Sequence, residues 1–387
     1  MTTRIRARDL GIPFSGTPGA LNAITDVAGI EVGHVTLSWG EGRLEVGKGP
    51  VRTGVTAVFP RGRGDPRLVF GGSFVLSGTG ELTGLAYLKE RGFIEGPVMI
   101  TNSHAVGVVG DASVQWTLKH GWTFDGTIPI VGETYDGSFN DINGGHVTRE
   151  HVWAALDAAR GGEVREGNVG GGTGMMCYEF KGGIGTSSRQ LAAEDGGHCV
   201  GVLVQANYGT RSQLRIAGIA VGRELAQDMP CYTDTSLRPQ DARYGVCGAT
   251  PSGSAREGRE GSIIVVVATD APLLPHQLKR LAKRPALAIG RLGGVATSWS
   301  GEIFIAFSTA NPDAGETDAA NVALPVLLYP NRALTPLFEA AIDATEEAIV
   351  NALVAAKTDT GRDGLRLTAL PHTRVRDILR AHNLLQT

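Results

Sequence analysis

"REGREGSIIVVVATDAPLLPHQL" spans residues 256–278 and contains an abrupt change from polar to apolar residues. A polar, glycine-spaced segment ends at Gly261, Ser262 follows, and the next six residues, 263–268, are all apolar. An apolar run of this length beside turn-forming residues is typical of a strand that is buried on both faces. The sequence therefore predicts a core strand whose first residue is a serine.

Comparable apolar runs and helical patterns alternate along the chain. The predicted strands lie at residues 55–59, 98–101, 200–205, 263–268 and 303–307, and the predicted helices at residues 152–159, 273–283 and 335–357. Glycine is unusually frequent, with 55 of 387 residues, which fits many strands joined by tight turns. The fold class predicted from these patterns is a layered α/β or α+β chain with one extended core.

Composition excludes several classes of protein. Hydrophobic residues make up 42% of the chain and charged residues 19%, which is typical of a globular protein rather than a disordered one. The net charge of -3 argues against nucleic acid or an anionic membrane as the main partner. No apolar stretch reaches membrane-spanning length, and the charged first 16 residues lack the apolar region of a signal peptide, so we expect a cytoplasmic protein.

The four cysteines do not form a recognisable metal or disulfide pattern. They are Cys177, Cys199, Cys231 and Cys247. No pair is spaced C-x-x-C and no histidine stands at finger spacing, so the sequence favours isolated reduced thiols over zinc or disulfides. "NVGGGTG", residues 168–174, fits neither glycine-rich phosphate motif, so nucleotide binding is not expected.

Residues 231–261 are poor in large apolar residues and rich in Gly, Ser, Thr, Arg and Pro. This composition predicts a flexible linker or surface loop. A loop of this length inside a compact protein is often functional, and this one ends directly at Ser262.

A serine at the start of a strand has a specific chemical use if the chain is cut before it. A Gly-Ser pair alone favours a simple turn. Cleavage after Gly261, however, would leave the α-amine and the hydroxyl on Ser262. A free α-amine titrates near neutrality, so it can accept the hydroxyl proton without a separate histidine. Gly261, which lacks a Cβ, can also adopt the backbone conformation that an internal acyl shift requires.

Other polar residues near predicted strand ends could complete such a site. Ser300 and Glu302 stand at i and i+2, so their side chains point to one face, where they could relay a proton or hold a substrate ammonium. Asn207 and Tyr135 each follow an apolar run and could donate to an oxyanion. Each feature alone fits an ordinary turn or a half-buried aromatic residue equally well. "TNSHAVG", residues 101–107, is a further candidate for the substrate cleft.

Taken together, these segments resemble the bacterial L-aminopeptidase D-Ala-esterase/amidase (DmpA) and β-peptidyl aminopeptidase family, which are self-cleaving hydrolases with an N-terminal nucleophile. The resemblance covers nearly the whole chain. It rests on blocks such as "GALNAITDVAGIEVGHVTL" at 19–37, "GETYDGSFNDI" at 132–142, "GSIIVVVATDAPLLPHQLKRLAKR" at 261–284 and "GEIFIAFSTAN" at 301–311.

The resemblance implies an architecture and an assembly. It implies a four-layer αββα sandwich of the DmpA and ornithine acetyltransferase type, in which residues 1–387 form one self-processing hydrolase domain. Residues 1–261 would be the α fragment and residues 262–387 the β fragment. The family also implies a homo-oligomer, a tetramer of such heterodimers, with no metal and no organic cofactor.

The resemblance also implies roles for the candidate residues. Ser262 corresponds to the nucleophile and Gly261-Ser262 to the self-cleavage bond. Ser300 and Glu302 correspond to the serine and glutamate that complete the site, Asn207 to the oxyanion-stabilising asparagine, and Tyr135 to the tyrosine that lines the site. The segment 231–261 is longer than is typical of the family, which leaves open how efficiently the chain cuts itself and whether a second cut falls within it.

The sequence thus leads to one main hypothesis and two alternatives. The main hypothesis is a cytoplasmic serine aminopeptidase that releases N-terminal residues from short peptides, amides or esters through an acyl-enzyme on Ser262, with Glu302 orienting the free amine of the substrate. One alternative is an acyltransferase like the ornithine acetyltransferases. The other is a non-enzymatic, glycine-rich binding protein in which Ser262 only caps a strand.

Overall fold

Two stacked sheets form the centre of the molecule. A computed structural model describes residues 5–122, 128–227, 229–240, 242–249, 261–315 and 323–385. In this part of the chain, the larger sheet has the strand order β4 (Phe93–Ile94), β3 (Val69–Gly78), β13 (Gly301–Ser308), β12 (Ser262–Thr269), β10 (Cys199–Asn207) and β9 (Gly183–Gln190). The smaller sheet has the order β1 (Glu31–Trp39), β2 (Val51–Phe59), β5 (Val98–Asn102) and β6 (Ile130–Thr134).

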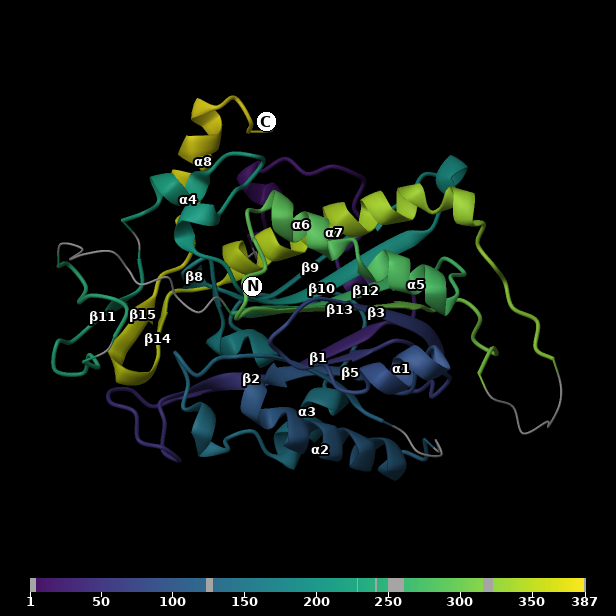
Figure 1. Cartoon of the computed structure of the whole chain (residues 1–387), viewed down its shortest axis with the longest axis horizontal. Coiled ribbons are helices and arrows are strands. Elements are labelled where there is room, and N and C mark those ends of the chain that lie inside the picture. The colour runs from purple at the N-terminus through teal and green to yellow at the C-terminus, as the bar shows by residue number, and fades with distance from the viewer. Residues whose placement is uncertain are drawn as a thin grey trace.

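Helices cover the outer face of each sheet (Figure 1). The larger sheet carries α5 (Pro275–Ala282), α6 (Pro285–Arg291) and α7 (Thr335–Ala355), and the smaller sheet carries α2 (Val106–Lys119) and α3 (Arg149–Asp157). The order of layers is therefore helix, sheet, sheet, helix, which confirms the predicted αββα sandwich.

Shorter elements surround this frame. They are the helices α1 (Leu85–Arg91), α4 (Val221–Glu224) and α8 (His372–Ala381), the small sheet of β11 (Cys231–Tyr232), β15 (Leu365–Leu367) and β14 (Asp359–Thr360), and the hairpin of β7 (Met176–Cys177) and β8 (Phe180–Lys181). The 3-10 helices are η1 (Arg8–Leu10), η2 (Ile24–Asp26), η3 (Ser103–Ala105), η4 (Ile142–Gly144), η5 (Gly170–Gly174), η6 (Ala193–Asp195), η7 (Arg211–Gln213), η8 (Asn331–Ala333) and η9 (Arg362–Gly364). The small sheet lies at one end of the sandwich (Figure 1).

Strand β12 is buried on both faces, as its apolar run predicts. Its odd-numbered side chains from Ile263 to Val267 belong to the core beneath the helices of the larger sheet. Its even-numbered side chains from Ile264 to Ala268 belong to the core between the two sheets. Because both layers need apolar contact, the strand has no polar face between Ser262 and Thr269.

The other predicted elements are confirmed, but several strands escaped prediction. The predicted strands fall within β2, β5, β10, β12 and β13, and the predicted helices overlap α3, α5 and α7. Strand β9, with the sequence GIGTSSRQ, was missed because it contains few apolar residues. Its Gly185 explains part of that composition, since a Cβ there would lie 1.9 Å from the carbonyl oxygen of Ala348 in α7. Close packing of helix on strand, rather than apolar periodicity, selects the residues of β9.

The prediction that all four cysteines are reduced thiols is wrong for two of them. Cys231 and Cys247 form a disulfide, with Cα atoms 4.9 Å apart, whereas Cys177 and Cys199 are free and buried. The chain turns back between the two bonded residues, and Cys247 N–H donates to the Tyr232 carbonyl at 2.9 Å. This return is a tertiary feature, and the spacing of the cysteines does not reveal it.

The predicted flexible linker is also wrong over much of its length. Residues 231–240 and 242–249 include β11, which pairs with β15, and the disulfide. Tyr232 and Tyr244 are buried in a cluster with Phe139 and Leu365. The two tyrosines and the disulfide hold this segment in place, although its average composition is polar. Residues 241 and 250–260 lie outside the described residues.

The helices are too short or too polar to cross a bilayer. This finding covers the part of the chain that the structure describes, and it holds even for α7, which has 21 residues.

Candidate active site

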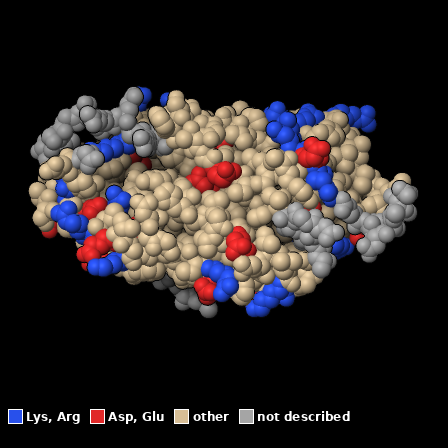
Figure 2. Space-filling view, turned by 60° about the horizontal axis from the view of Figure 1, so that its bottom comes forward, with Lys and Arg blue, Asp and Glu red and all other residues tan. Residues whose placement is uncertain are grey.

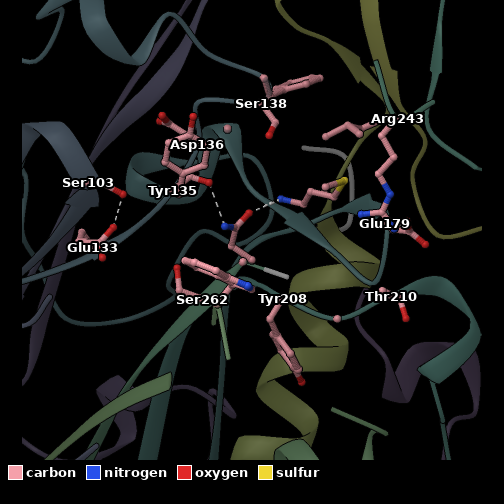
Figure 3. A pocket seen from close by; sticks show the side chains of 18 of the residues that line it. Ser103, Glu133, Tyr135, Asp136, Ser138, Glu179, Tyr208, Thr210, Arg243 and Ser262 are labelled. Atoms are coloured by element: carbon pink, nitrogen blue, oxygen red, sulfur yellow. Dashed lines mark hydrogen bonds and ion pairs between the residues drawn. The ribbon is translucent and has the colours of Figure 1, made fainter. Parts of the chain in front are cut away.

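A pocket of about 530 Å³ opens at the end of the sandwich where β10 and β12 meet. Its volume lies in the range of sites that bind small molecules. The residues that line it include Gly261 and Ser262 from the predicted cleavage bond, as well as Asn207 and Tyr135. Figure 3 shows Tyr135 and Ser262 in this pocket. The structure thus brings together three of the five predicted catalytic residues on its wall.

Strand pairing explains why Ser262 and Asn207 meet. Ser262 is the first residue of β12, and in the antiparallel pairing of β10 with β12 it lies directly opposite Asn207. Side chains of directly opposed residues lie on the same face of a sheet. Ser262 is 4% exposed, so its hydroxyl lies in a largely enclosed position.

Ser300 and Glu302 reach the predicted cleavage bond from the other neighbouring strand. Strand β13 runs parallel to β12, with Gly301 opposite Ser262. The Ser300 hydroxyl contacts the Gly261 carbonyl oxygen at 2.5 Å and also forms a short hydrogen bond with Glu302 Oε1. Both side chains are buried, and neither lines the pocket itself. Glu302 therefore stands behind Ser300, at a distance from the space where a substrate amine would bind.

The backbone at Gly261 passes very close to Asn207. A Cβ at position 261 would lie 1.7 Å from the Asn207 carbonyl oxygen and 2.5 Å from Asn207 Nδ2. No side chain fits there without moving β10. The glycine before the serine is therefore required by the close approach of the two strands.

The amide of Asn207 is held in a fixed orientation. Its Nδ2 donates to the Tyr135 carbonyl at 3.0 Å, and its Oδ1 accepts from the Met176 N–H at 2.8 Å. A carboxamide nitrogen carries two hydrogens, so Nδ2 can donate a second hydrogen bond. The Tyr135 side chain is 49% exposed, and its ring lies on the pocket wall. These positions suit donors to a developing oxyanion.

Glu133 is a pocket residue that sequence reasoning missed. Its carboxylate accepts from Glu81 N–H at 2.9 Å and from the Ser103 hydroxyl. Burial raises the pKa of this carboxyl, while the hydrogen bond from Ser103 opposes the shift. Glu133 stands in the block "VGETYDG", so its place after an apolar run was the available signal. Ser103 of "TNSHAVG" lines this pocket as well.

The opposite part of the pocket carries a second pair of charged residues that was not predicted. Arg243 and Glu179 both line the cavity, and their side chains form an ion pair at 2.6 Å. Figure 3 shows this pair on one side of Ser262, with Glu133 and Ser103 on the other. Arg243 falls in the segment that composition identified as a linker, so the sequence offered no signal for it.

Asp136 is a buried carboxyl beside the pocket. Burial raises its pKa to about 7, and hydrogen bonds, including one from Asn140 at 3.0 Å, only partly offset that shift. Between pH 4 and pH 7 the folded protein therefore keeps a proton on Asp136 that the unfolded chain has released. In this window stability must fall as the pH rises.

Asp136→Asn should remove this pH dependence. We expect the free energy of unfolding of the wild-type protein to fall, relative to the variant, by up to about 1.4 kcal/mol per pH unit between pH 4 and pH 7. Urea unfolding curves of both proteins at several pH values measure the difference. A difference that stays constant over this window would contradict the assignment. Asp111→Asn, on the exposed face of α2, is the matched control.

Known proteins share both the fold and the sequence. Residues 22–367 match peptidase family S58. The chain is 53% identical to the β-peptidyl aminopeptidase BapA of Sphingosinicella microcystinivorans over 380 residues, which cover 98% of this chain and 93% of that protein.

Solved structures agree. The L-aminopeptidase D-Ala-esterase/amidase of Ochrobactrum anthropi, described as a prototype of the serine aminopeptidases and a variant of the Ntn hydrolase fold, is 42% identical with a TM-score of 0.86. It covers 98% of this chain and 99% of its own. A Burkholderia sp. β-aminopeptidase is 44% identical with a TM-score of 0.82, over 97% and 99% of the two chains.

The family match over most of the chain and the aminopeptidase relatives with the same fold identify a hydrolase that acts on peptide bonds. The chain belongs to peptidase family S58 and is a serine aminopeptidase. The resemblance to the DmpA and β-peptidyl aminopeptidase family is thereby confirmed. These matches favour neither the acyltransferase nor the non-enzymatic binding protein.

Proposed function

We propose that this aminopeptidase is made as a precursor that cuts itself between Gly261 and Ser262. The observation that carries the proposal is the Ser300 hydroxyl, 2.5 Å from the Gly261 carbonyl oxygen. When the single hydroxyl hydrogen is donated to this oxygen rather than to Glu302, it polarises the carbonyl of the bond to be cut. The products would be an α fragment of residues 1–261 and a β fragment of residues 262–387.

Self-cleavage would proceed as an acyl shift. The Ser262 hydroxyl oxygen attacks the Gly261 carbonyl carbon, and the C–N bond between the two residues breaks as the nitrogen takes up a proton. The resulting ester joins Gly261 to the Ser262 side chain, and water hydrolyses it. This sequence leaves a free α-amine beside the hydroxyl on Ser262.

The mature site would then cleave substrates in the same two stages. The Ser262 amine accepts the hydroxyl proton, and the hydroxyl oxygen attacks the first amide carbonyl of the substrate. Asn207 Nδ2 and the Tyr135 hydroxyl donate to the oxyanion. The leaving amine takes the proton, and water then releases the N-terminal residue from the acyl-enzyme. Ser300 and Glu302 act behind the serine as a proton path.

Glu133 is better suited than Glu302 to hold the free amine of the substrate. Glu133 lines the pocket, whereas Glu302 is 1% exposed and hydrogen-bonded to Ser300. A buried carboxylate facing a small cavity is a natural partner for an ammonium group. The names of the relatives then suggest the class of substrate: short peptides, amides or esters whose N-terminal residue is a β-amino acid.

We also propose that the cleaved chain forms a homo-oligomer, which the family resemblance implies to be a tetramer of heterodimers. An exposed apolar run before α7 supports an interface. Val326, Leu327 and Leu328 are 42%, 68% and 58% exposed, which is unusual for neighbouring large apolar residues.

Cellular location remains a prediction with two opposing arguments. The sequence favoured the cytoplasm, but disulfides such as Cys231–Cys247 are rare in a reducing compartment. Quenching the cells in acid, alkylating the denatured protein and mass spectrometry measure the state of these cysteines, because denaturation also exposes the buried thiols of Cys177 and Cys199. Two alkylated residues would support an oxidising location, and four would support the cytoplasm.

The direct test of self-cleavage is the intact mass of the purified protein under denaturing conditions. We expect two species of roughly 27 and 13 kDa, in proportion to the 261 and 126 residues of the 40.5 kDa chain, with the smaller one beginning at Ser262. A single full-length species that persists after long incubation would overturn the proposal, because the amine of Ser262 would never be freed.

A further inference from the structure

The pocket is electrically asymmetric about the nucleophile. Glu133 lies on one side of Ser262, and Arg243 lies on the other (Figure 3). The proposed mechanism uses Glu133 but leaves Arg243 without a role. The Arg243 side chain is only 22% exposed where it lines the pocket, and a partly buried guanidinium favours anionic partners.

The ion pair with Glu179 uses only part of the hydrogen-bonding capacity of Arg243. The carboxylate of Glu179 also accepts from the Arg211 N–H at 2.8 Å and from the Tyr244 hydroxyl at 3.1 Å. Arg243 offers five N–H donors and places Nη2 on Glu179. Its Nε is buried and has no hydrogen-bond partner among the residues that the structure describes.

The local charge leaves room for a further anion. The guanidinium of Arg211 is buried against the same residue, donating to the Glu179 and Tyr178 carbonyl oxygens at 2.5 and 3.0 Å. Two arginine side chains thus contact Glu179, Arg243 at its carboxylate and Arg211 at its backbone carbonyl oxygen. The positive charge of these side chains at this end of the pocket favours a further anion, such as the carboxylate of a substrate.

The loop that carries Arg243 is held in place before substrate arrives. The disulfide Cys231–Cys247 closes it, and Tyr244 is buried next to the arginine. Arg238 donates to the carbonyl oxygens of Tyr244 and Ala242 at 2.8 and 2.9 Å. A fixed guanidinium loses less freedom on binding than a mobile one, so it selects more strongly.

We propose that Arg243 binds the C-terminal carboxylate of a short peptide substrate and so makes the enzyme select small peptides with both termini free. The ammonium group would bind at Glu133, the carboxylate at Arg243, and the bond to be cut would lie between them at Ser262. This inference rests on the proposed aminopeptidase function and extends it to the leaving side of the substrate.

The test compares a free acid with its amide. The N-terminal residue is chosen as the one that the wild-type enzyme releases fastest from a series of aminoacyl p-nitroanilides, which carry no carboxylate. The dipeptide of that residue with leucine and the corresponding leucinamide are then compared. We expect kcat/KM for the acid to exceed that for the amide by about 10- to 100-fold. This ratio corresponds to the free energy of a charge-assisted hydrogen bond.

Arg243→Gln should remove this preference. We expect kcat/KM for the acid to fall by about 10- to 100-fold, while the amide and the p-nitroanilide change by no more than about twofold. Arg243→Lys should keep part of the preference, because it retains the charge without the two parallel donors. Arg291→Gln, a surface arginine paired with Asp343, is the matched control and should leave all three substrates unchanged.

The possible results distinguish failure of the Arg243 proposal from failure of the proposed aminopeptidase function. Equal loss on acid and amide would overturn the proposal, because Arg243 would then only support the loop. So would a wild-type enzyme that cleaves acid and amide equally well, although the aminopeptidase function would stand. A wild-type protein that cleaves none of the p-nitroanilides and neither dipeptide would overturn both.

Discussion

We expect Ser262→Ala to leave the chain uncut at 387 residues and to remove its aminopeptidase activity. In the proposed mechanism, the substitution deletes the one oxygen that attacks both the Gly261 carbonyl and the substrate, so both reactions should stop for the same reason. Loss of a nucleophile that acts with its base as one unit lowers kcat by at least about 10⁴-fold. Denaturing mass spectrometry measures the cleavage, and release of p-nitroaniline measures the activity.

Ser298→Ala provides the comparison for this variant. Ser298 is an exposed serine close to Ser300 in the sequence, and it does not line the pocket. The Ser298→Ala protein should therefore cut itself and turn over substrate like the wild-type protein. A Ser262→Ala protein that is cleaved or fully active would remove Ser262 from the mechanism.

Glu133→Gln should separate substrate hydrolysis from self-cleavage. Replacing a buried carboxylate that pairs with an ammonium lowers kcat/KM for substrates with a free amine by about 100-fold or more. The internal bond after Gly261 has no ammonium beside it, so the variant should still yield the two fragments. Intact mass and steady-state kinetics on one preparation measure both effects.

The pH profile gives a second signature of Glu133. Burial raises the pKa of its carboxyl above the ordinary glutamate value, and ammonium binding requires the ionised form. For the wild-type enzyme, kcat/KM should therefore fall as the pH drops through this raised pKa, in addition to the decline caused by protonation of the Ser262 amine, and the Gln variant should keep only the latter decline. Glu90→Gln, on the exposed surface of α1, should behave like the wild type. A Glu133→Gln enzyme with full activity would mean that another group holds the amine.

The sequence predicts the structure best where burial depends on neighbouring residues in the chain. The apolar run from 263 to 268 predicts a strand buried on both faces, and β12 confirms it. It failed for β9, whose glycines and hydroxyl residues are chosen by the approach of α7. It also failed for residues 231–249, where two buried tyrosines and a disulfide are diluted by polar neighbours.

In the candidate site, too, some features follow from local spacing in the sequence and others only from the pairing of distant strands. The pairing of Ser300 with Glu302 follows from their i, i+2 spacing, and the structure joins them by a hydrogen bond. Asn207 was proposed from its place at a strand end, but its position opposite Ser262 follows from the pairing of β10 with β12. Register between strands distant in the chain depends on which faces each strand buries, and the sequence of one strand does not contain that information.

By itself, the sequence determined the buried strand that begins at Ser262, the glycine before it and the family to which the chain belongs. Only the tertiary structure decided that Glu133 and Arg243 lie on opposite sides of Ser262, and that Cys231 meets Cys247. The reason is physical: apolar periodicity records how deeply a residue is buried, because burial recurs along one element. The meeting of charged or sulfur-bearing side chains depends on contacts between distant segments, which leave no periodic trace in the sequence.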